Sequence, residues 1–184
     1  KKEMPIYRIQ TALLLIKKYH LHQRRASGEP FYYHPLAVAC HVLQYIPEAE
    51  EDLVIAALLH DAVEDTDLTL PMIETFFGEK VTQMVIGLTK CDTKGLRKAA
   101  YSQPDIYRNL YNGGKNVWAI KLCDRLHNME TLGARKRDKQ IKVAEETVRD
   151  YIPAAQEYDF HELAKALNIL TKTYLDPNYE VQNG

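Results

Sequence analysis

The sequence has three cysteines and no C-x-x-C pair, which excludes two common ways of stabilising a small fold. Cys40, Cys91 and Cys123 are odd in number and unevenly spaced, arguing against a disulfide framework and against a thiolate zinc site. Long apolar runs are also missing: the run from Thr11 to Ile16 is far too short to span a bilayer, and no charged-then-apolar signal pattern opens the sequence. We therefore expect reduced thiols and a cytoplasmic protein without a membrane partner.

No sign of charge dominates the composition. Lys and Arg number 24 against 25 Asp and Glu, a net charge of −1, so bulk electrostatics give no reason to expect a nucleic-acid partner. The 184 residues, of which 46% are hydrophobic, are enough to bury a core without covalent staples. We expect a single domain over residues 1–184.

The alternation of apolar and polar residues that marks β-strands is missing, and so is any internal repeat. Apolar residues recur at helical spacing instead. The pattern predicts helices over residues 6–19, 35–45, about 50–65, 68–77, 81–88, 116–132, 138–158 and 161–174. Residues 90–115 are weakly patterned, with a short helix at 106–111, and we expect them to be mobile. The predicted fold class is all-α, a bundle of about eight or more helices.

Titratable residues gather between Ala57 and Thr66, directly after an apolar run. If one helix carries this stretch, Glu64 lies four residues from His60 and Asp65 lies four from Asp61, so all four side chains project toward one side. Ionised side chains are rarely buried unless they are paired or bind a metal. A divalent cation would resolve that conflict.

A polar stripe on the predicted helix over 116–132 offers further ligands. On this otherwise apolar helix, the stripe consists of Lys121, Asp124, Arg125, Asn128 and Thr131. The candidate metal ligands are then His34, His60, Asp61 and Asp124. Two imidazoles and two carboxylates suit a divalent ion such as Mn²⁺, with zinc left open, and leave positions for water and a phosphate oxygen.

Each of these residues also has a structural interpretation. His34 could cap the helix that begins at Pro35, and Asp124 could pair with a basic residue of its own helix. Glu64 and Asp65 could be solvated acids near a helix end. Two histidines outside the set, His20 and His127, are interpreted as packed side chains, and the basic turn from Arg135 to Lys139 is interpreted as mainly solvated.

Four motifs make the chain resemble a known family. They are Arg25-Ala26-Ser27-Gly28-Glu29-Pro30 with His34-Pro35, His60-Asp61-Ala62-Val63-Glu64-Asp65-Thr66, Gly87-Leu88-Thr89-Lys90, and Lys121-Leu122-Cys123-Asp124-Arg125-Leu126-His127-Asn128. With them the chain resembles the HD phosphohydrolase superfamily and, more closely, the hydrolase domain of the RelA/SpoT homologues, which degrade the alarmone (p)ppGpp. The likeness runs from about Ile6 to Tyr151.

This resemblance implies an HD-domain helical bundle with a central metal site, in which His34, His60, Asp61 and Asp124 hold one Mn²⁺. Glu64 and Asp65 are implied to handle the hydrolytic water and the metal-bound phosphate. The implied contacts to the guanine nucleotide come from Arg25, Ser27, Lys121, Asn128 and Thr131. The implied activity is that of a guanosine-3′,5′-bis(diphosphate) 3′-pyrophosphohydrolase of the stringent response, which releases pyrophosphate and leaves GDP or GTP.

The sequence departs from the family pattern at three positions. The family often has a basic residue at Ala26, tyrosine at Phe31 and alanine at Cys123. The first change would loosen a phosphate or base contact, and none removes a ligand.

Since the chain ends where long members continue into a synthetase domain, we expect a stand-alone small alarmone hydrolase, with an excised domain as the other option. Two other functions stay open: a phosphohydrolase acting on another nucleotide such as the NADPH 2′-phosphate, or a non-catalytic nucleotide-binding regulatory domain. The oligomeric state is not predicted.

Overall fold

Helices and the turns between them make up residues 6–89 and 103–176, the part of the chain that the computed structural model describes. Within these two ranges there is no β-strand, and an isolated bridge pairs Arg24 with Pro30 across a loop. The predicted all-α fold is confirmed. The elements are α1 (Ile6–Tyr19), α2 (Tyr33–Tyr45), α3 (Glu51–Leu59), α4 (Ala62–Asp65), α5 (Leu70–Phe77), α6 (Glu79–Leu88), α7 (Gln103–Glu130), the 3₁₀ turn η1 (Leu132–Ala134), α8 (Arg137–Glu146), the π-helical segment η2 (Thr147–Tyr151), α9 (Ile152–Glu157) and α10 (His161–Leu175).

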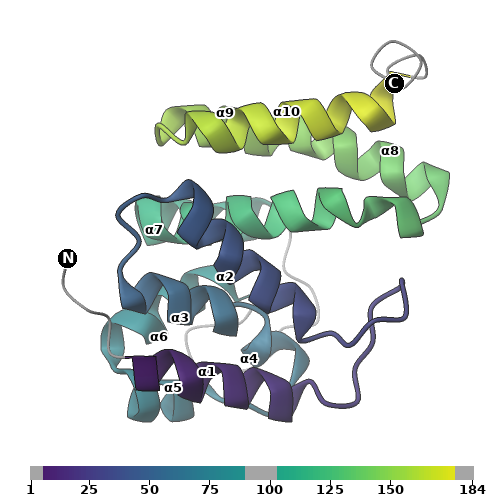
Figure 1. Ribbon diagram of the computed structural model, residues 1–184. Helices are drawn as coiled ribbons and strands as arrows, with labels where there is room; N and C mark the ends of the chain where they lie inside the picture. Colours follow the sequence, from purple (N-terminus) through teal and green to yellow (C-terminus); the bar gives the residue numbers. More distant parts are fainter. Residues whose placement is uncertain (1–5, 90–102, 177–184) are drawn as a thin grey trace.

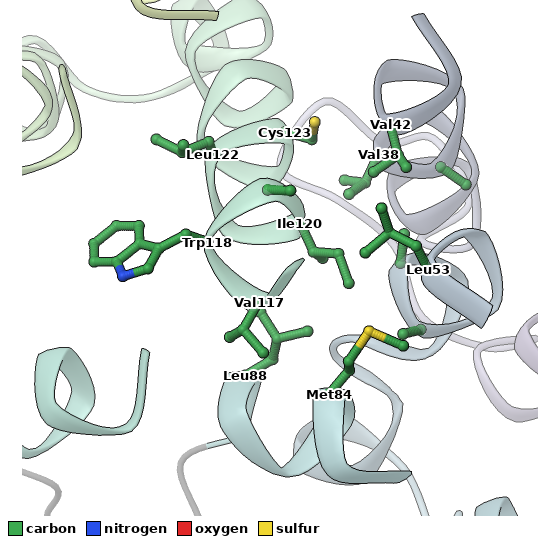
Figure 2. Close-up of a cluster of buried hydrophobic side chains, with 14 of the residues drawn as sticks. Val38, Val42, Leu53, Met84, Leu88, Val117, Trp118, Ile120, Leu122 and Cys123 are labelled. Atoms are coloured by element: carbon green, nitrogen blue, oxygen red, sulfur yellow. The ribbon is translucent and has the colours of Figure 1, made fainter. Parts of the chain in front are cut away.

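Helix α7 occupies the centre of the fold because it is buried on more than one side. In Figure 1 it lies between the helices α1 to α6 and the layer formed by α8, α9 and α10. Trp118 and Ile120 are fully buried. Figure 2 shows Trp118 pointing to one side of α7 and Ile120 pointing to the other, toward Val38 and Leu53. Burying an aromatic or branched side chain contributes about 1.5–3 kcal/mol, so these contacts fix the position of α7 firmly.

Two residues singled out in the sequence lie in this core. Cys123 is completely buried among apolar side chains, where it acts as a small core residue. At Gly87, a Cβ atom would lie 3.0 Å from the side chain of Val117, so the absence of a side chain allows α6 to approach α7 closely. Lys90, which ends the same motif, lies outside the described residues, as do residues 91–102 of the segment expected to be mobile.

The predicted helix through His60 to Asp65 is wrong in one respect, because it is interrupted. Helix α3 ends at Leu59, and α4 begins at Ala62 after a turn made by His60 and Asp61. The backbone of Asp61 has φ −100° and ψ −7°, away from regular helical values. Aspartate favours such turn and cap positions, since its short side chain competes for backbone hydrogen bonds.

The two helices predicted at 106–111 and 116–132 are confirmed. Both lie within the element α7, where they are separated by a kink at Gly114, with φ 71° and ψ −163°. The helix predicted over 138–158 contains the π-helical segment η2 between α8 and α9. Among the residues that the structure describes, no helix combines the length and the apolar character needed to cross a membrane.

Candidate metal centre

Three predicted ligands meet where the start of α2 faces the break between α3 and α4. His34 lies in the first turn of α2, and His60 and Asp61 form the break. One ligand atom from each of these residues lies within 4.8 Å of the other two. Asp61 Oδ2 is 3.0 Å from His60 Nε2 and 3.4 Å from His34 Nε2. In a regular helix the side chains of two consecutive residues point about 100° apart around the axis. The break between α3 and α4 allows the side chains of His60 and Asp61 to meet instead.

The fourth predicted ligand, Asp124, reaches the same place from α7. Its Oδ1 atom lies 3.1 Å from His34 Nε2 and 3.8 Å from His60 Nε2. The carboxylate is buried, and Lys121 Nζ donates a hydrogen bond to its Oδ2 at 2.8 Å. The structure therefore brings all four residues together from three separate segments. That they hold a metal stays a prediction.

The hydrogen bonds fix which nitrogen of His60 carries a proton. Nδ1 lies 2.8 Å from the carbonyl oxygen of Ala57, and because a carbonyl oxygen only accepts, Nδ1 must donate. The lone pair of the neutral ring is then on Nε2, which faces the carboxylate oxygens of Asp61 and Asp124. A lone pair facing two anionic oxygens needs a proton or a metal ion between them. The donor set therefore fits a divalent cation.

The pKa shifts describe the same competition. Burial alone would lower the pKa of His60, but Asp61 and Asp124 outweigh it and raise that pKa to about 9. Burial opposes ionisation of Asp61, whereas His60 and His34 lower its pKa well below its usual range. The pKa of Asp124 is also lowered against the effect of burial, mainly by Lys121 and His34. Both carboxylates are thus ionised, and the cluster has a strong affinity for a positive charge.

His127, which the sequence predicts to be a packed histidine, makes a specific contact with His34. Its ring stacks on His34 with 4.9 Å between the ring centroids, and the two Nδ1 atoms are 2.7 Å apart. Burial, with smaller effects of His34 and Arg25, lowers the pKa of His127 to about 4, so the ring is neutral at pH 7. If His34 offers its Nε2 lone pair to a metal, its Nδ1–H donates to His127, which orients the ring. The signal in the sequence was the position of His127 three residues after Asp124, one turn along the helix.

The predicted catalytic acids lie in α4, the single turn that follows Asp61. Glu64 is half-buried and Asp65 is exposed. The backbone N–H of Asp65 donates to the carbonyl of Asp61 at 3.0 Å, which ties the turn to the metal centre. The catalytic roles of both acids stay predictions.

The predicted nucleotide contacts line one cleft of about 220 Å³ beside the metal centre. Arg25 Nη2 donates to Asn128 Oδ1 at 3.2 Å and to Thr131 Oγ1 at 3.0 Å. Asn128 Nδ2 in turn donates to Asp124 Oδ1 at 2.6 Å, which connects the cleft to the metal centre. The lining residues are Arg25, Ala26, Ser27, Lys121, Asp124, Arg125, Asn128, Thr131, Leu132, Ala134, Arg135, Lys139, Val143 and Glu146.

Two basic residues that line this cleft lie outside the predicted set. The turn that carries Arg135 and Lys139 is interpreted from the sequence as mainly solvated, and both residues are exposed, but both also line the cleft. Arg135 lies between η1 and α8 and Lys139 lies in α8, so neither belongs to the stripe of α7. The concentration of basic residues from Arg135 to Lys139 was the available signal. With Arg25, Lys121 and Arg125 these two residues make the cleft strongly cationic, which suits an anionic ligand.

With this geometry in hand, comparison with known proteins decides the family. A family model described as the HD domain matches residues 12–159, most of the chain. The chain belongs to the HD domain family.

This HD domain is 36% identical over 179 residues to the bifunctional (p)ppGpp synthase/hydrolase SpoT of Escherichia coli K12, in a match that covers 96% of the chain and 25% of SpoT. It is 36% identical over 162 residues to the GTP pyrophosphokinase rsh of Brucella melitensis, covering 86% of the chain and 21% of that protein. The chain therefore spans about a quarter of the length of these curated relatives.

Two solved structures share the fold. One is described as a metazoan ortholog of SpoT that hydrolyses ppGpp and plays a role in starvation responses; it is 24% identical, with a TM-score of 0.65 and 98% of both chains covered. The other is lmo0812 from Listeria monocytogenes, also 24% identical, with a TM-score of 0.53, covering 79% of this chain and 99% of that one. The HD-domain helical bundle predicted from the motifs is confirmed.

Proposed function

We propose that this HD domain is a (p)ppGpp 3′-pyrophosphohydrolase, which hydrolyses ppGpp or pppGpp to GDP or GTP and pyrophosphate. The observation that carries the proposal is the union of a four-ligand metal centre with a cationic cleft through the bonded residues Asp124, Asn128 and Arg25. A substrate with several phosphates would have its reacting phosphate at the metal centre and its other charges in the cleft. The 36% identity to SpoT supports the same activity.

His34, His60, Asp61 and Asp124 would hold one Mn²⁺. Their mixed nitrogen and oxygen donors suit Mn²⁺, and the lone pair on His60 Nε2 faces the two carboxylates as a ligand would. When bound, the ion lowers the pKa of a coordinated water and polarises a phosphoryl oxygen. Lys121 supports the centre by its hydrogen bond to Asp124, which leaves the other carboxylate oxygen directed at the imidazoles.

Glu64 and Asp65 are proposed to take the proton of the attacking water and to position it. Both lie in the one-turn helix α4, which directly follows Asp61. The hydrogen bond from Asp65 N–H to the carbonyl of Asp61 fixes the position of this turn relative to the metal centre. A carboxylate near the water acts as a general base, which typically contributes 10²- to 10⁴-fold in rate.

Arg25, Ser27, Lys121, Asn128 and Thr131 are proposed to bind the nucleotide. The planar guanidinium of Arg25 is held by two acceptors, Asn128 in α7 and Thr131 just after it, so its fork is pre-oriented toward the cleft. Its pKa is lowered by burial, yet arginine stays charged at any physiological pH. A cytoplasmic location, the lack of nucleic-acid and membrane partners, the single domain and the stand-alone character of the chain remain predictions.

Hydrolysis by metal-stripped protein re-supplied with Mn²⁺, Mg²⁺ or Zn²⁺ tests the proposal. ppGpp and NADPH are offered in parallel, and the phosphorus products are identified by chromatography. The expected result is Mn²⁺-dependent release of pyrophosphate from ppGpp, abolished in Asp61→Ala and kept in the control His22→Ala, an exposed histidine outside the site. Release of phosphate from NADPH alone would show that the substrate is a dinucleotide and not ppGpp. No release from either compound would refute a hydrolytic function.

A further inference from the structure

The loop between α1 and α2 contains a buried polar pair that the proposed chemistry does not use. His20 follows the last turn of α1 and is completely buried. Its Nδ1 atom lies 2.8 Å from Oε1 of Gln23, and Nε2 of Gln23 donates to the carbonyl oxygen of Asp65 at 2.6 Å. A relay of two side chains thus connects the end of α1 with the turn that carries Glu64 and Asp65.

The direction of these hydrogen bonds follows from their last member. The carbonyl oxygen of Asp65 only accepts, so the amide nitrogen of Gln23 must face it and the amide oxygen must face His20. His20 therefore donates from Nδ1. The backbone of Gln23 is fixed as well, because its carbonyl accepts the N–H of Phe31 at 3.0 Å. The relay has one orientation and a rigid base.

The acceptor at the end of the relay is a group that needs a partner. Helix α4 has only four residues. The carbonyl groups in the last turn of any helix receive no hydrogen bond from an N–H group of the same helix. Gln23 supplies the donor for Asp65 from 42 positions earlier in the chain. The same loop is tied to the metal centre, since Phe31 packs against His20 with ring centroids 4.8 Å apart and against His34 at 5.8 Å.

An apolar residue at position 20 would pack in this core without leaving a polar ring to be satisfied. Burying the polar imidazole instead lowers the stability of the fold, because its Nε2 has no hydrogen-bond partner within the part of the chain that the structure describes. What the imidazole provides, and a Leu or Phe would not, is the hydrogen bond that fixes the amide of Gln23.

We propose that His20 and Gln23 are positioning residues of the active site, which hold the Glu64–Asp65 turn against the metal centre. This inference rests on the proposed hydrolase function for its effect on rate, but not for its effect on structure. Loss of the relay leaves the four ligands and the cleft in place. It allows α4 to move, so the turnover number falls while Mn²⁺ affinity and KM stay nearly the same.

The experiment compares Gln23→Met, which keeps the size but removes the donor, with the control His22→Ala. Amide hydrogen exchange of the full chain is measured by mass spectrometry, together with kcat, KM and Mn²⁺ affinity. We expect exchange in residues 61–66 to be about fivefold faster in Gln23→Met, as for the loss of one hydrogen bond, and kcat to be about tenfold lower with KM and Mn²⁺ affinity within about twofold. Unchanged exchange in residues 61–66 overturns the proposal.

A second pair of variants separates positioning from packing. His20→Asn keeps a donor near the position of Nδ1, whereas His20→Phe fills the space without one. We expect His20→Asn to retain slow exchange and kcat, and His20→Phe to behave like Gln23→Met; equal behaviour of the two overturns the proposal. If wild-type protein fails to hydrolyse ppGpp while exchange responds as expected, the proposed function falls and the structural role of the relay stands.

Discussion

Metal binding at the proposed centre of His34, His60, Asp61 and Asp124 should release a proton, and the reason lies in His60. The carboxylates of Asp61 and Asp124 raise the pKa of His60 from 6.5 to about 9, so without a bound ion the ring is mostly protonated at pH 7. A raised pKa means that the proton is held at low pH and lost only as pH rises through about 9. A divalent ion must displace this proton, so its apparent affinity should rise about tenfold per pH unit, or about thirtyfold between pH 6.5 and 8.0.

Titration calorimetry measures this directly. Metal-stripped protein is titrated with Mn²⁺ at pH 7.0 in two buffers of different ionisation enthalpy, and the difference in heat gives the number of protons released. We expect about one proton per ion, and the same number for the control variant His22→Ala. An affinity that does not change between pH 6.5 and 8.0, with no proton released, would refute the assignment of His60 as a ligand held between two carboxylates.

Four further results are expected. His127→Phe should lower Mn²⁺ affinity about ten- to a hundredfold in calorimetry, because His34 loses its orienting hydrogen bond; equal affinity would contradict this role. Gly114→Ala should lower the free energy of unfolding in urea by about 1–3 kcal/mol, since φ 71° and ψ −163° strain any side chain; an unchanged midpoint would argue against the kink. Arg25→Lys should raise KM for ppGpp about tenfold, because a lysine cannot reproduce the fork held by Asn128 and Thr131, whereas Arg24→Lys should leave KM unchanged; equal values would remove Arg25 from the site. Mn²⁺ at a hundred times its Kd should raise the free energy of unfolding by about 3 kcal/mol, seen as a higher Tm that chelation reverses; a Tm insensitive to metal would exclude binding to the folded state.

The helical fold could be predicted because its signal is local. Apolar residues at helical spacing place α1, α2, α5, α6 and α10 close to their observed limits. The interruption at His60 and Asp61 could not be predicted in this way. Nothing in the spacing of the apolar residues marks a break there, and the observed turn brings Asp61 against His60, its neighbour in the chain, and against His34, which lies far from it in the sequence.

The candidate ligands could also be named from the sequence, because few other residue types suit a divalent ion and the motifs arrive in a known order. The contacts that orient them could not. His34 meets His127 across 93 positions of the chain, and Gln23 meets Asp65 across 42. Such pairs depend on how α2, α4 and α7 pack, which no spacing within one helix encodes.

The burial of α7 on opposite sides has a consequence for anyone who wishes to change the substrate of this domain. Asp124 and Asn128 lie on the same helix as Trp118 and Ile120, so a substitution that alters the cleft by moving this helix must also repack the core. Ala26 and Ser27 in the neighbouring loop have no such constraint, since both are exposed and line the cleft. Redesign or directed evolution of specificity should therefore accumulate changes in that loop first, and variants of α7 should need compensating changes in the core.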